Sequence, residues 1–301
     1  DFSSIVGQTH AKRALEIAAA GGHNCILNGT PGSGKTMLAK AFKGILPPMT
    51  LDESLEVTKI YSVAGLLNKD NPFLVKRPYR SPHHTISHIA LTGGGIHLRP
   101  GEITLANKGV LFLDEFPEFE GRSIEVLRQP LEDKVITISR STGTVEYPAD
   151  FLVLAAMNPC KCGYFGDTIK ECVCSAKQIS DYKKRISGPI MDRFDLQVWV
   201  DKVDLSDLEK ASKDELSSSI KKRVTQARQI QSLRYKNLNY KLNSQIPSQD
   251  IDKFINISNQ ARNLLKQANQ KFNFSARSYF KLLKVARTIA DLENQQEVKE
   301  E

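Results

Sequence analysis

The residues with the clearest chemical meaning are 29–36, which read Gly-Thr-Pro-Gly-Ser-Gly-Lys-Thr. They fit G-x-x-x-x-G-K-[ST], the loop whose backbone N–H groups surround the phosphates of a nucleoside triphosphate. Lys35 is placed to reach the β- and γ-phosphates, and Thr36 to offer its hydroxyl to Mg²⁺. Residues 24–27 and 37–42 supply the strand before the loop and the helix after it. The predicted nucleotide site comprises Gly29, Thr30, Pro31, Gly32, Ser33, Gly34, Lys35, Thr36 and Met37.

A second run, residues 109–115, reads Gly-Val-Leu-Phe-Leu-Asp-Glu and ends in two acids. Its apolar part predicts a buried parallel strand, and ligands of an open α/β sheet lie at the carboxyl ends of the strands. Asp114 would hold the Mg²⁺ shell, and Glu115 would polarise the attacking water as a general base. The alternative is that both acids only cap the next helix. Because this run follows a phosphate loop in the sequence, it favours an ATPase.

Two polar residues stand beside further strand candidates. Asn158 follows the apolar residues 152–157 and is placed to hold the attacking water or to sense the γ-phosphate. The alternative for Asn158 is an ordinary turn residue before a proline. Arg193 precedes the last strand candidate, from which its guanidinium can project toward the γ-phosphate of a neighbouring subunit. The alternative for Arg193 is a surface ion pair with Asp192 or Asp195.

Arg277 lies at the start of the last predicted helix, where Ser275 is the expected N-cap. A cation in the first turn of a helix opposes the helix dipole. An anion opposite the side chain, such as a bound nucleotide, would explain an arginine at this position.

The composition limits the classes of protein. The chain has 301 residues, 40% of them hydrophobic, which suits one large or two smaller domains. It has no signal peptide and no apolar stretch of about 18 residues, so we expect no membrane segment. Because it begins with Asp1 directly at a motif, we expect a piece of a longer protein. The net charge of +8 favours an acidic partner such as nucleic acid.

Strand and helix signals alternate over residues 1–203, which predicts an α/β fold with a parallel sheet and crossover helices. The strand candidates are residues 25–28, 56–60, 110–114, 151–157 and 196–200. Helical periodicity dominates after residue 203 and covers 206–235, 248–272 and 275–295. We therefore predict a nucleotide-binding core, 1–203, followed by an all-helical domain, 204–301.

A cysteine cluster occupies residues 160–174 and consists of Cys160, Cys162, Cys172 and Cys174. Four thiolates suit tetrahedral Zn²⁺, which favours a structural metal clip in a reducing cytoplasm over disulfides. A reduced cluster without metal and a redox switch are the alternatives. His84 and His88 are four residues apart but have no evident third ligand, so no second metal site is predicted there.

Two segments are candidates for contacts with nucleic acid. Residues 71–101 contain no acid but four histidines and the basic residues Lys76, Arg77, Arg80 and Arg99. Residues 134–148 predict a hairpin whose strands cover 135–138 and 143–147, with the tip Ser139-Arg140-Ser141-Thr142. Basic elements of this kind contact phosphates without reading sequence. The alternative is solvated loops with incidental charge. The predicted DNA contacts are Lys76, Arg77, Arg80 and Arg140.

Together these motifs resemble those of AAA+ ATPases of the magnesium-chelatase-like ComM/YifB family. The resemblance covers essentially all 301 residues. Besides the phosphate loop, it is carried by DF (1–2), IVGQ (5–8), AAAGGHN (18–24), GILPP (44–48), SPHHT (81–85), GGG (93–95), RPGE (99–102), LDE (113–115), RQPLED (128–133), AMNPC (156–160), RISGP (185–189) and VARTIADL (285–292). The departures are mild: Thr30 and Lys161 stand where prolines are common in the family.

The resemblance implies an AAA+ core with a C-terminal helical lid and ATP with Mg²⁺ bound between the subunits of a hexameric ring. It assigns the Walker roles to Lys35, Thr36, Asp114 and Glu115. It also places Val6 in the segment that lines the adenine pocket.

The resemblance further makes Asn158 the first sensor and Arg277 the second. Arg193 becomes the arginine finger acting in trans, with Arg185 as the alternative. Family members are associated with DNA branch migration during natural transformation, and inserts at the positions of residues 71–101 and 134–148 face the pore of the ring. Members also carry an N-terminal domain resembling the Lon/ribosomal-S5 fold, which this sequence lacks.

Three classes of function follow. The favoured one is a hexameric, DNA-stimulated ATPase motor of the helicase or branch-migration type. The second is a metal-insertion motor like the ATPase subunit of magnesium chelatase, and the third is a protein-remodelling AAA+ machine; neither acts on DNA. The cysteine cluster and the acid-free, His-rich segment favour the first class over the second.

Overall fold

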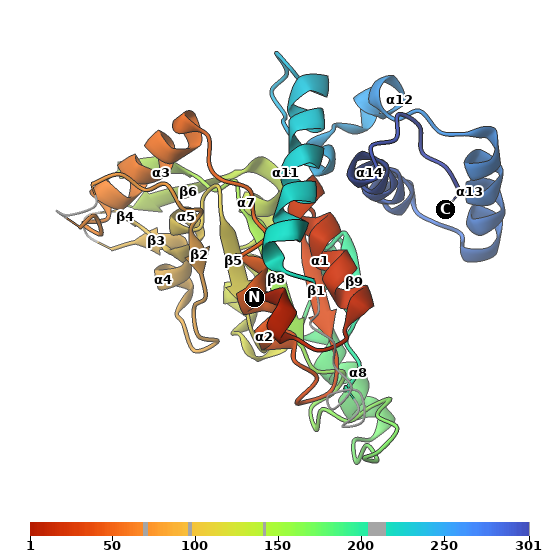
Figure 1. Ribbon diagram of the computed structural model, residues 1–301. Coiled ribbons are helices and arrows are strands. Elements are labelled where there is room, and N and C mark those ends of the chain that lie inside the picture. The colour runs from red at the N-terminus through yellow and green to blue at the C-terminus, as the bar shows by residue number, and fades with distance from the viewer. Residues whose placement is uncertain (69–71, 96–97, 141–142, 204–214, 301) are drawn as a thin grey trace.

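A five-stranded, all-parallel sheet in the order β2-β5-β8-β1-β9 forms the centre of the computed structural model, which describes residues 1–68, 72–95, 98–140, 143–203 and 215–300 (Figure 1). The strands are β1 (Cys25–Asn28), β2 (Tyr79–Arg80), β5 (Val110–Leu113), β8 (Leu152–Met157) and β9 (Leu196–Trp199). The middle strands β5 and β8 are buried throughout, which explains their unbroken apolar sequences. The predicted α/β fold with a parallel sheet is confirmed.

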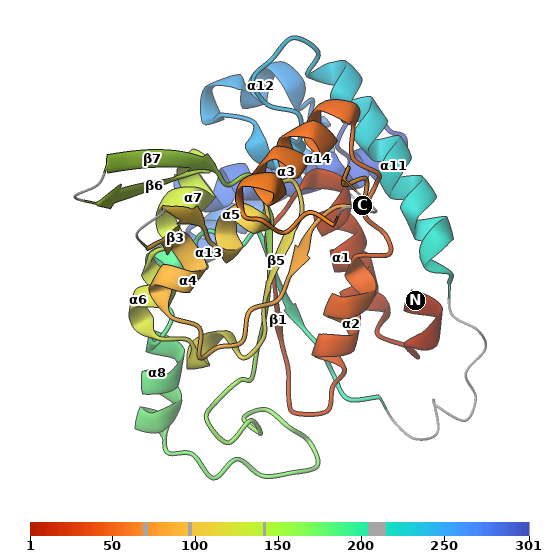
Figure 2. The ribbon, with the colours of Figure 1, turned by 90° about the vertical axis from the view of Figure 1, so that its left-hand side faces the viewer.

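Helices cover both faces of the sheet (Figure 2). One face packs against α1 (Thr9–Gly21), α2 (Lys35–Phe42) and α11 (Ser217–Arg234). The other packs against α4 (His88–Thr92), α5 (Glu102–Leu105), α6 (Gly121–Glu125), α7 (Arg128–Asp133), α8 (Ala176–Lys184) and α9 (Gly188–Met191). Successive strand residues alternate between the two cores: Leu154 enters the first and Val153 the second. Short 3-10 turns, η1 (Phe2–Ser4) and η2 (Phe116–Glu118), complete this part.

The predicted strand at residues 56–60 is wrong, because these residues lie inside the helix α3 (Leu51–Val63). Thr50 and Glu53 form a reciprocal capping box at its start, and Val57 and Ile60 are buried at a spacing of three. The fifth strand is instead β2, which has only two residues and therefore no periodic signal.

The predicted hairpin is confirmed as β6 (Val135–Arg140) paired with β7 (Gly143–Pro148). Ser141 and Thr142 of its tip lie outside the described residues. The segment 71–101 contains β2, α4 and the short antiparallel pair β3 (Gly93–Gly94) and β4 (Arg99–Pro100). Asn71 and His97 of that segment also lie outside the described residues.

After residue 215 the described chain forms α11, η3 (Asn243–Gln245), η4 (Ser248–Asp250), α12 (Ile251–Phe254), α13 (Asn259–Phe272) and α14 (Ala276–Leu292). The single helix predicted over 248–272 is wrong, because the chain leaves the helix after α12 and Ser258 caps a new one by accepting from the backbone N–H of Ala261. α11 adds its apolar side chains to the first core, whereas a third cluster begins at Tyr235. The boundary predicted near residue 203 adjoins residues 204–214, which lie outside the described residues, and stays a prediction. Among the described helices, none combines the length and apolar character needed to cross a membrane.

Candidate nucleotide site

The phosphate loop connects the end of β1 to the start of α2. Gly34 adopts a left-handed backbone with φ of 89°, and a Cβ on Gly29 would lie 2.3 Å from the backbone oxygen of Val200. The Lys35 ammonium donates to the backbone oxygens of Gly29, at 2.6 Å, and Thr30, at 2.8 Å. Burial lowers the pKa of Lys35 to about 8, while nearby Asp114 opposes the shift. Lys35 is therefore a desolvated cation that the backbone of the loop holds in place, in the loop where phosphate would bind.

Two oxygen ligands suited to Mg²⁺ meet beside this lysine. The Thr36 hydroxyl donates to Oδ2 of Asp114 at 2.8 Å, and the backbone N–H of Glu115 donates to Oδ1 at 3.0 Å. Asp114 reaches Thr36 because β5 and β1 are both neighbours of β8 and end at the same edge of the sheet. Hydroxyl and carboxylate oxygens are the donors that Mg²⁺ prefers, so the residues present fit a nucleotide-bound magnesium ion.

Gln8 is a contact of the phosphate loop that the sequence did not reveal. Its side-chain amide donates to the backbone oxygens of Ser33, at 3.2 Å, and Asp201, at 2.5 Å. It therefore ties the start of α1 to both the loop and the chain after β9. The only signal was its place in the IVGQ motif. The adenine contacts predicted for Val6 and for Met37, whose side chain is exposed on α2, stay predictions.

Asn158 directly follows β8, the neighbour of β1 in the sheet. A Cβ on Gly163 would lie 2.6 Å from Cγ of Pro31 and 3.9 Å from Cγ of Asn158. Asn158, the loop carrying Gly163 and the phosphate loop are therefore in one neighbourhood. This position is compatible with the predicted contact to the attacking water.

Arg193 lies at the opposite end of the sheet from the phosphate loop of its own chain. The backbone N–H groups of Asp195 and Leu196 donate to the oxygen of Asn24, 2.9 and 3.1 Å away, which places the start of β9 at the start of β1. The phosphate loop follows the end of β1, about 13 Å further along at the usual rise per residue. The sheet thus separates Arg193 from its own Lys35.

The Arg193 side chain is buried and forms an ion pair with Glu132, not with Asp192 or Asp195. Its Nη1 also donates to the backbone oxygen of Pro189 at 3.4 Å, and its buried Nε has no acceptor among the described residues. Burial lowers the pKa of Arg193, and the positive charges of Arg277 and Arg128 add to the shift.

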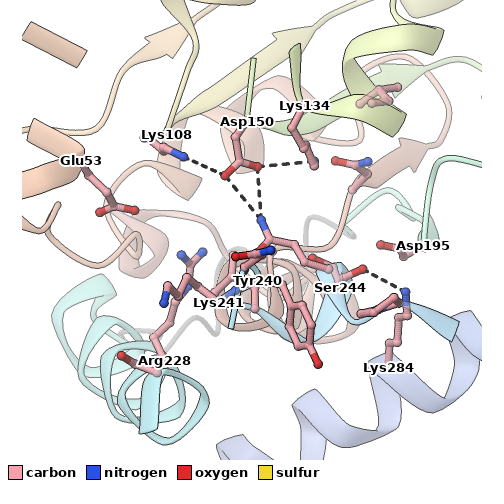
Figure 3. A pocket seen from close by; sticks show the side chains of 18 of the residues that line it. Glu53, Lys108, Lys134, Asp150, Asp195, Arg228, Tyr240, Lys241, Ser244 and Lys284 are labelled. Atoms are coloured by element: carbon pink, nitrogen blue, oxygen red, sulfur yellow. Dashed lines mark hydrogen bonds and ion pairs between the residues drawn. The ribbon is translucent and has the colours of Figure 1, made fainter. Parts of the chain in front are cut away.

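Arg277 is exposed in the first turn of α14, and Ser275 is the N-cap, as predicted, accepting from the backbone N–H of Ser278 at 3.1 Å. With Arg193 and Lys284 it lines a cavity of about 1550 Å³. Figure 3 shows Lys284 and Asp195 on one side of this cavity and Asp150 on another. Arg193, the predicted arginine finger, and Arg277, the predicted second sensor, therefore share a cavity remote from the phosphate loop. The alternative finger, Arg185, pairs instead with Glu118 at 2.8 Å.

The four cysteines of the cluster come together as a ligand set. Their Sγ atoms all lie within 4.8 Å of one another, and Cys160 is 3.4 Å from Cys162 and 3.7 Å from Cys172. Tetrahedral zinc with Zn–S bonds of 2.3 Å sets sulfur atoms about 3.8 Å apart. The thiols are unbridged, and the arrangement fits a thiophilic metal ion.

The predicted DNA contacts differ in their surroundings. Arg77 pairs with Glu53 at 2.7 Å and donates to the backbone oxygen of Pro47 at 2.8 Å. Arg80 makes two bonds of 2.6 Å to Glu102. Lys76 is exposed. Arg140 ends β6, opposite Gly143 of β7. Lys76 is therefore better placed for a partner than Arg77 and Arg80, whose charges are neutralised by acids within the chain. The contact predicted for Arg140 stays a prediction.

Comparison with protein-family models matches residues 1–208 to magnesium chelatase, subunit ChlI, and residues 214–301 to the C-terminal part of that subunit. The chain is 43% identical to Competence protein ComM of Haemophilus influenzae over 300 residues, which are 99% of this chain and 57% of ComM. It is also 43% identical to the uncharacterized protein YifB of Salmonella typhimurium over 296 residues, 97% of this chain and 57% of YifB. The magnesium-chelatase 67 kDa subunit of Chlorobaculum parvum shares 26% identity over 164 residues, 52% of this chain and 23% of that subunit.

Proposed function

Because the chain belongs to the magnesium chelatase ChlI family, together with ComM and YifB, we propose that it is the ATPase part of a hexameric DNA motor of the helicase or branch-migration type. The observation that carries the ATPase is the convergence of Lys35, Thr36, Asp114 and Glu115 at one edge of the sheet. The chain spans 57% of the length of ComM, so the activity of the whole protein is part of the proposal.

In the proposed hydrolysis, Lys35 exchanges its two backbone acceptors for phosphate oxygens. Thr36 and Asp114 would hold a magnesium ion, which when bound would neutralise charge on the phosphates. Glu115 accepts a proton from the attacking water, and Asn158 holds that water in line. The backbone N–H bond to Asp114 fixes the position of Glu115 beside the metal ligands.

The cation that stabilises the transition state comes from a neighbouring subunit. Arg193 and Arg277 share a cavity that lies beyond the sheet from their own phosphate loop. The buried Nε of Arg193, which has no acceptor among the described residues, supports a role toward an external anion. In a ring where each subunit presents this cavity to the nucleotide bound by the next subunit, both arginines would have a phosphate group to contact.

DNA is the proposed partner. The exposed Lys76, the net charge of +8 and the β6–β7 hairpin, which projects from the body of the molecule in Figure 2, support contacts with phosphates. Similarity to a competence protein favours DNA over a metal chelate or a protein as the substrate. Arg140 at the end of β6 would take part in these contacts, whereas Arg77 and Arg80 would support the fold beside them.

The cysteine cluster is proposed to hold structural zinc, in a protein of the reducing cytoplasm. The sulfur spacing supports the metal, and the contact between Gly163 and Pro31 places the clipped loop against the phosphate loop. A fixed loop at this place would hold Asn158 and Pro31 at a constant position relative to each other.

The test is displacement of a fluorophore-labelled strand from branched DNA. With ATP we expect displacement, and with a non-hydrolysable analogue we expect DNA binding without displacement. ATP hydrolysis with no binding to any DNA would reject the DNA motor and support the chelatase-like or protein-remodelling ATPase.

A further inference from the structure

The backbone that carries Arg193 is held by side chains from two other parts of the chain. Residues 192–195 form the turn between α9 and β9. Nδ2 of Asn24, just before β1, donates to the backbone oxygen of Arg193 at 3.0 Å. Nζ of Lys281, in α14, donates to the backbone oxygen of Phe194 at 3.0 Å. Both carbonyl groups lie outside α9 and β9, so these side chains supply the hydrogen bonds that regular structure does not.

The two donors belong to different parts of the molecule. Asn24 belongs to the sheet, because its Oδ1 accepts from the backbone N–H of Val153 in β8 at 2.8 Å. Lys281 follows Arg277 by four residues in α14, and side chains at this spacing lie on one face of a helix. Lys281 therefore joins the helix of the predicted second sensor to the turn of the predicted arginine finger.

The charges around Lys281 agree with this place between the two elements. Lys281 lines the cavity of about 1550 Å³ together with Arg193 and Arg277. Burial lowers the pKa of Lys281, and the carboxylates of Asp195 and Asp192 oppose the shift. The positive charges of Arg277 and Arg193 add to it. The ammonium group is thus close enough to both arginines to feel their charge.

The spacing of the two arginines decides whether both can contact one nucleotide. Arg193 moves with the turn 192–195, whereas Arg277 moves with α14. A catalytic group misplaced by about 1 Å can cost about 100-fold in rate. The hydrogen bond from Lys281 to the turn is a direct contact between the two elements, so it limits how far one arginine can shift relative to the other.

We infer that Lys281 is a positioning residue that fixes α14 to the turn 192–195, so that Arg193 and Arg277 reach the neighbouring nucleotide as one unit. The inference deepens the proposed function and rests on it, because it requires that Arg193 acts on the adjoining subunit. Lys281 acts through the two arginines and not on the nucleotide itself.

The test measures kcat and KM for ATP in Lys281→Met, which keeps most of the side chain and removes the ammonium group. We expect kcat to fall about ten- to 100-fold, with KM within about twofold of the wild-type value, because the phosphate loop of the same chain is untouched. Lys281→Arg keeps a donor and should recover most of kcat. Glu293→Gln is the matched control, since it breaks the contact of the residue after α14 with Arg13 of α1, at 2.9 Å, and leaves the turn alone. It should keep the wild-type kcat.

Mixing of variants separates positioning from general damage. Glu115→Gln lacks the base but keeps the turn and α14, so rings mixed from it and Lys281→Met should regain hydrolysis. Arg193→Ala is defective on the same side of the interface as Lys281→Met, so these two should not rescue each other. A wild-type kcat in Lys281→Met, or a failure of Glu115→Gln to rescue it, overturns the inference. If Arg193→Ala and Glu115→Gln fail to rescue each other, the trans assignment is rejected, and the inference falls with it.

Discussion

Loss of Arg193 in one subunit should be rescued by a neighbouring subunit that keeps its own Arg193. Arg193 lies at the far end of β1 from its own phosphate loop. Under the proposed assignment, Arg193→Ala would remove a charge from the adjoining active site and leave its own intact. Removal of a trans-acting arginine lowers kcat by about 10³-fold. Glu115→Gln has the complementary defect, since it loses the base and keeps the finger.

Mixing the two inactive proteins should restore hydrolysis. In randomly mixed rings at equal concentration, about a quarter of the interfaces join an intact active site to an intact Arg193. We therefore expect about a quarter of the wild-type rate, measured by phosphate release. An absence of rescue, in rings shown to mix by mass, would refute the trans assignment.

A control separates catalysis from folding. Arg193 is also paired with Glu132, so Arg193→Ala removes an internal contact. Glu132→Gln breaks the same contact and keeps the guanidinium. It should retain most of the activity, whereas a loss as large as that of Arg193→Ala would indicate a structural role.

The remaining predictions concern other parts of the molecule. Because burial lowers the pKa of Lys35 to about 8, the free loop loses its positive charge above that pH, and ADP binding measured by calorimetry should weaken from pH 7 to pH 9. An ADP affinity that stays constant from pH 7 to pH 9 would contradict the assignment. Because the pKa of Lys35 is lowered by folding, the unfolded chain binds more protons than the folded chain between about pH 8 and 10.5, so the contribution of Lys35 to the free energy of unfolding rises with pH in that window. Cys172→Ser should release zinc measured by emission spectrometry and lower Tm, whereas Cys25→Ser, outside the cluster, should keep the metal. Arg140→Ala should reduce the salt slope of DNA binding by about one, and Lys76→Ala the same, with unchanged slopes contradicting the contact. The side chain of Asp291 is fully buried against Arg234 and Arg287. Asp291→Ala should therefore lower the free energy of unfolding, measured by urea denaturation, by about 3–5 kcal/mol. A decrease below about 1 kcal/mol would contradict the buried network.

The sequence predicted those features that depend on local spacing. The phosphate loop needs Gly34 and Lys35 at fixed offsets, and an apolar strand ending in Asp114 has few other interpretations. Both motifs therefore predict the nucleotide site from the sequence alone. The helix α3 was missed because residues 56–60 contain β-branched side chains, while the capping box that starts the helix lies further back at Thr50.

Features that depend on contacts between distant segments were not predictable. Gln8 reaches Ser33, and Arg193 reaches Glu132, only because the fold brings segments that are distant in the sequence together. The acid-free segment 71–101 suggested free positive charge at Arg77, yet its partner Glu53 lies outside that segment on α3. Local composition therefore overestimates the charge available to a partner.

The most direct test of the account is the rate of ATP hydrolysis with and without single-stranded and branched DNA, in the wild type and in Glu115→Gln. The account predicts hydrolysis that DNA stimulates severalfold and that disappears in Glu115→Gln while ATP binding persists. Robust hydrolysis that no DNA changes would contradict the DNA motor, and hydrolysis that survives in Glu115→Gln would contradict the assignment of the base.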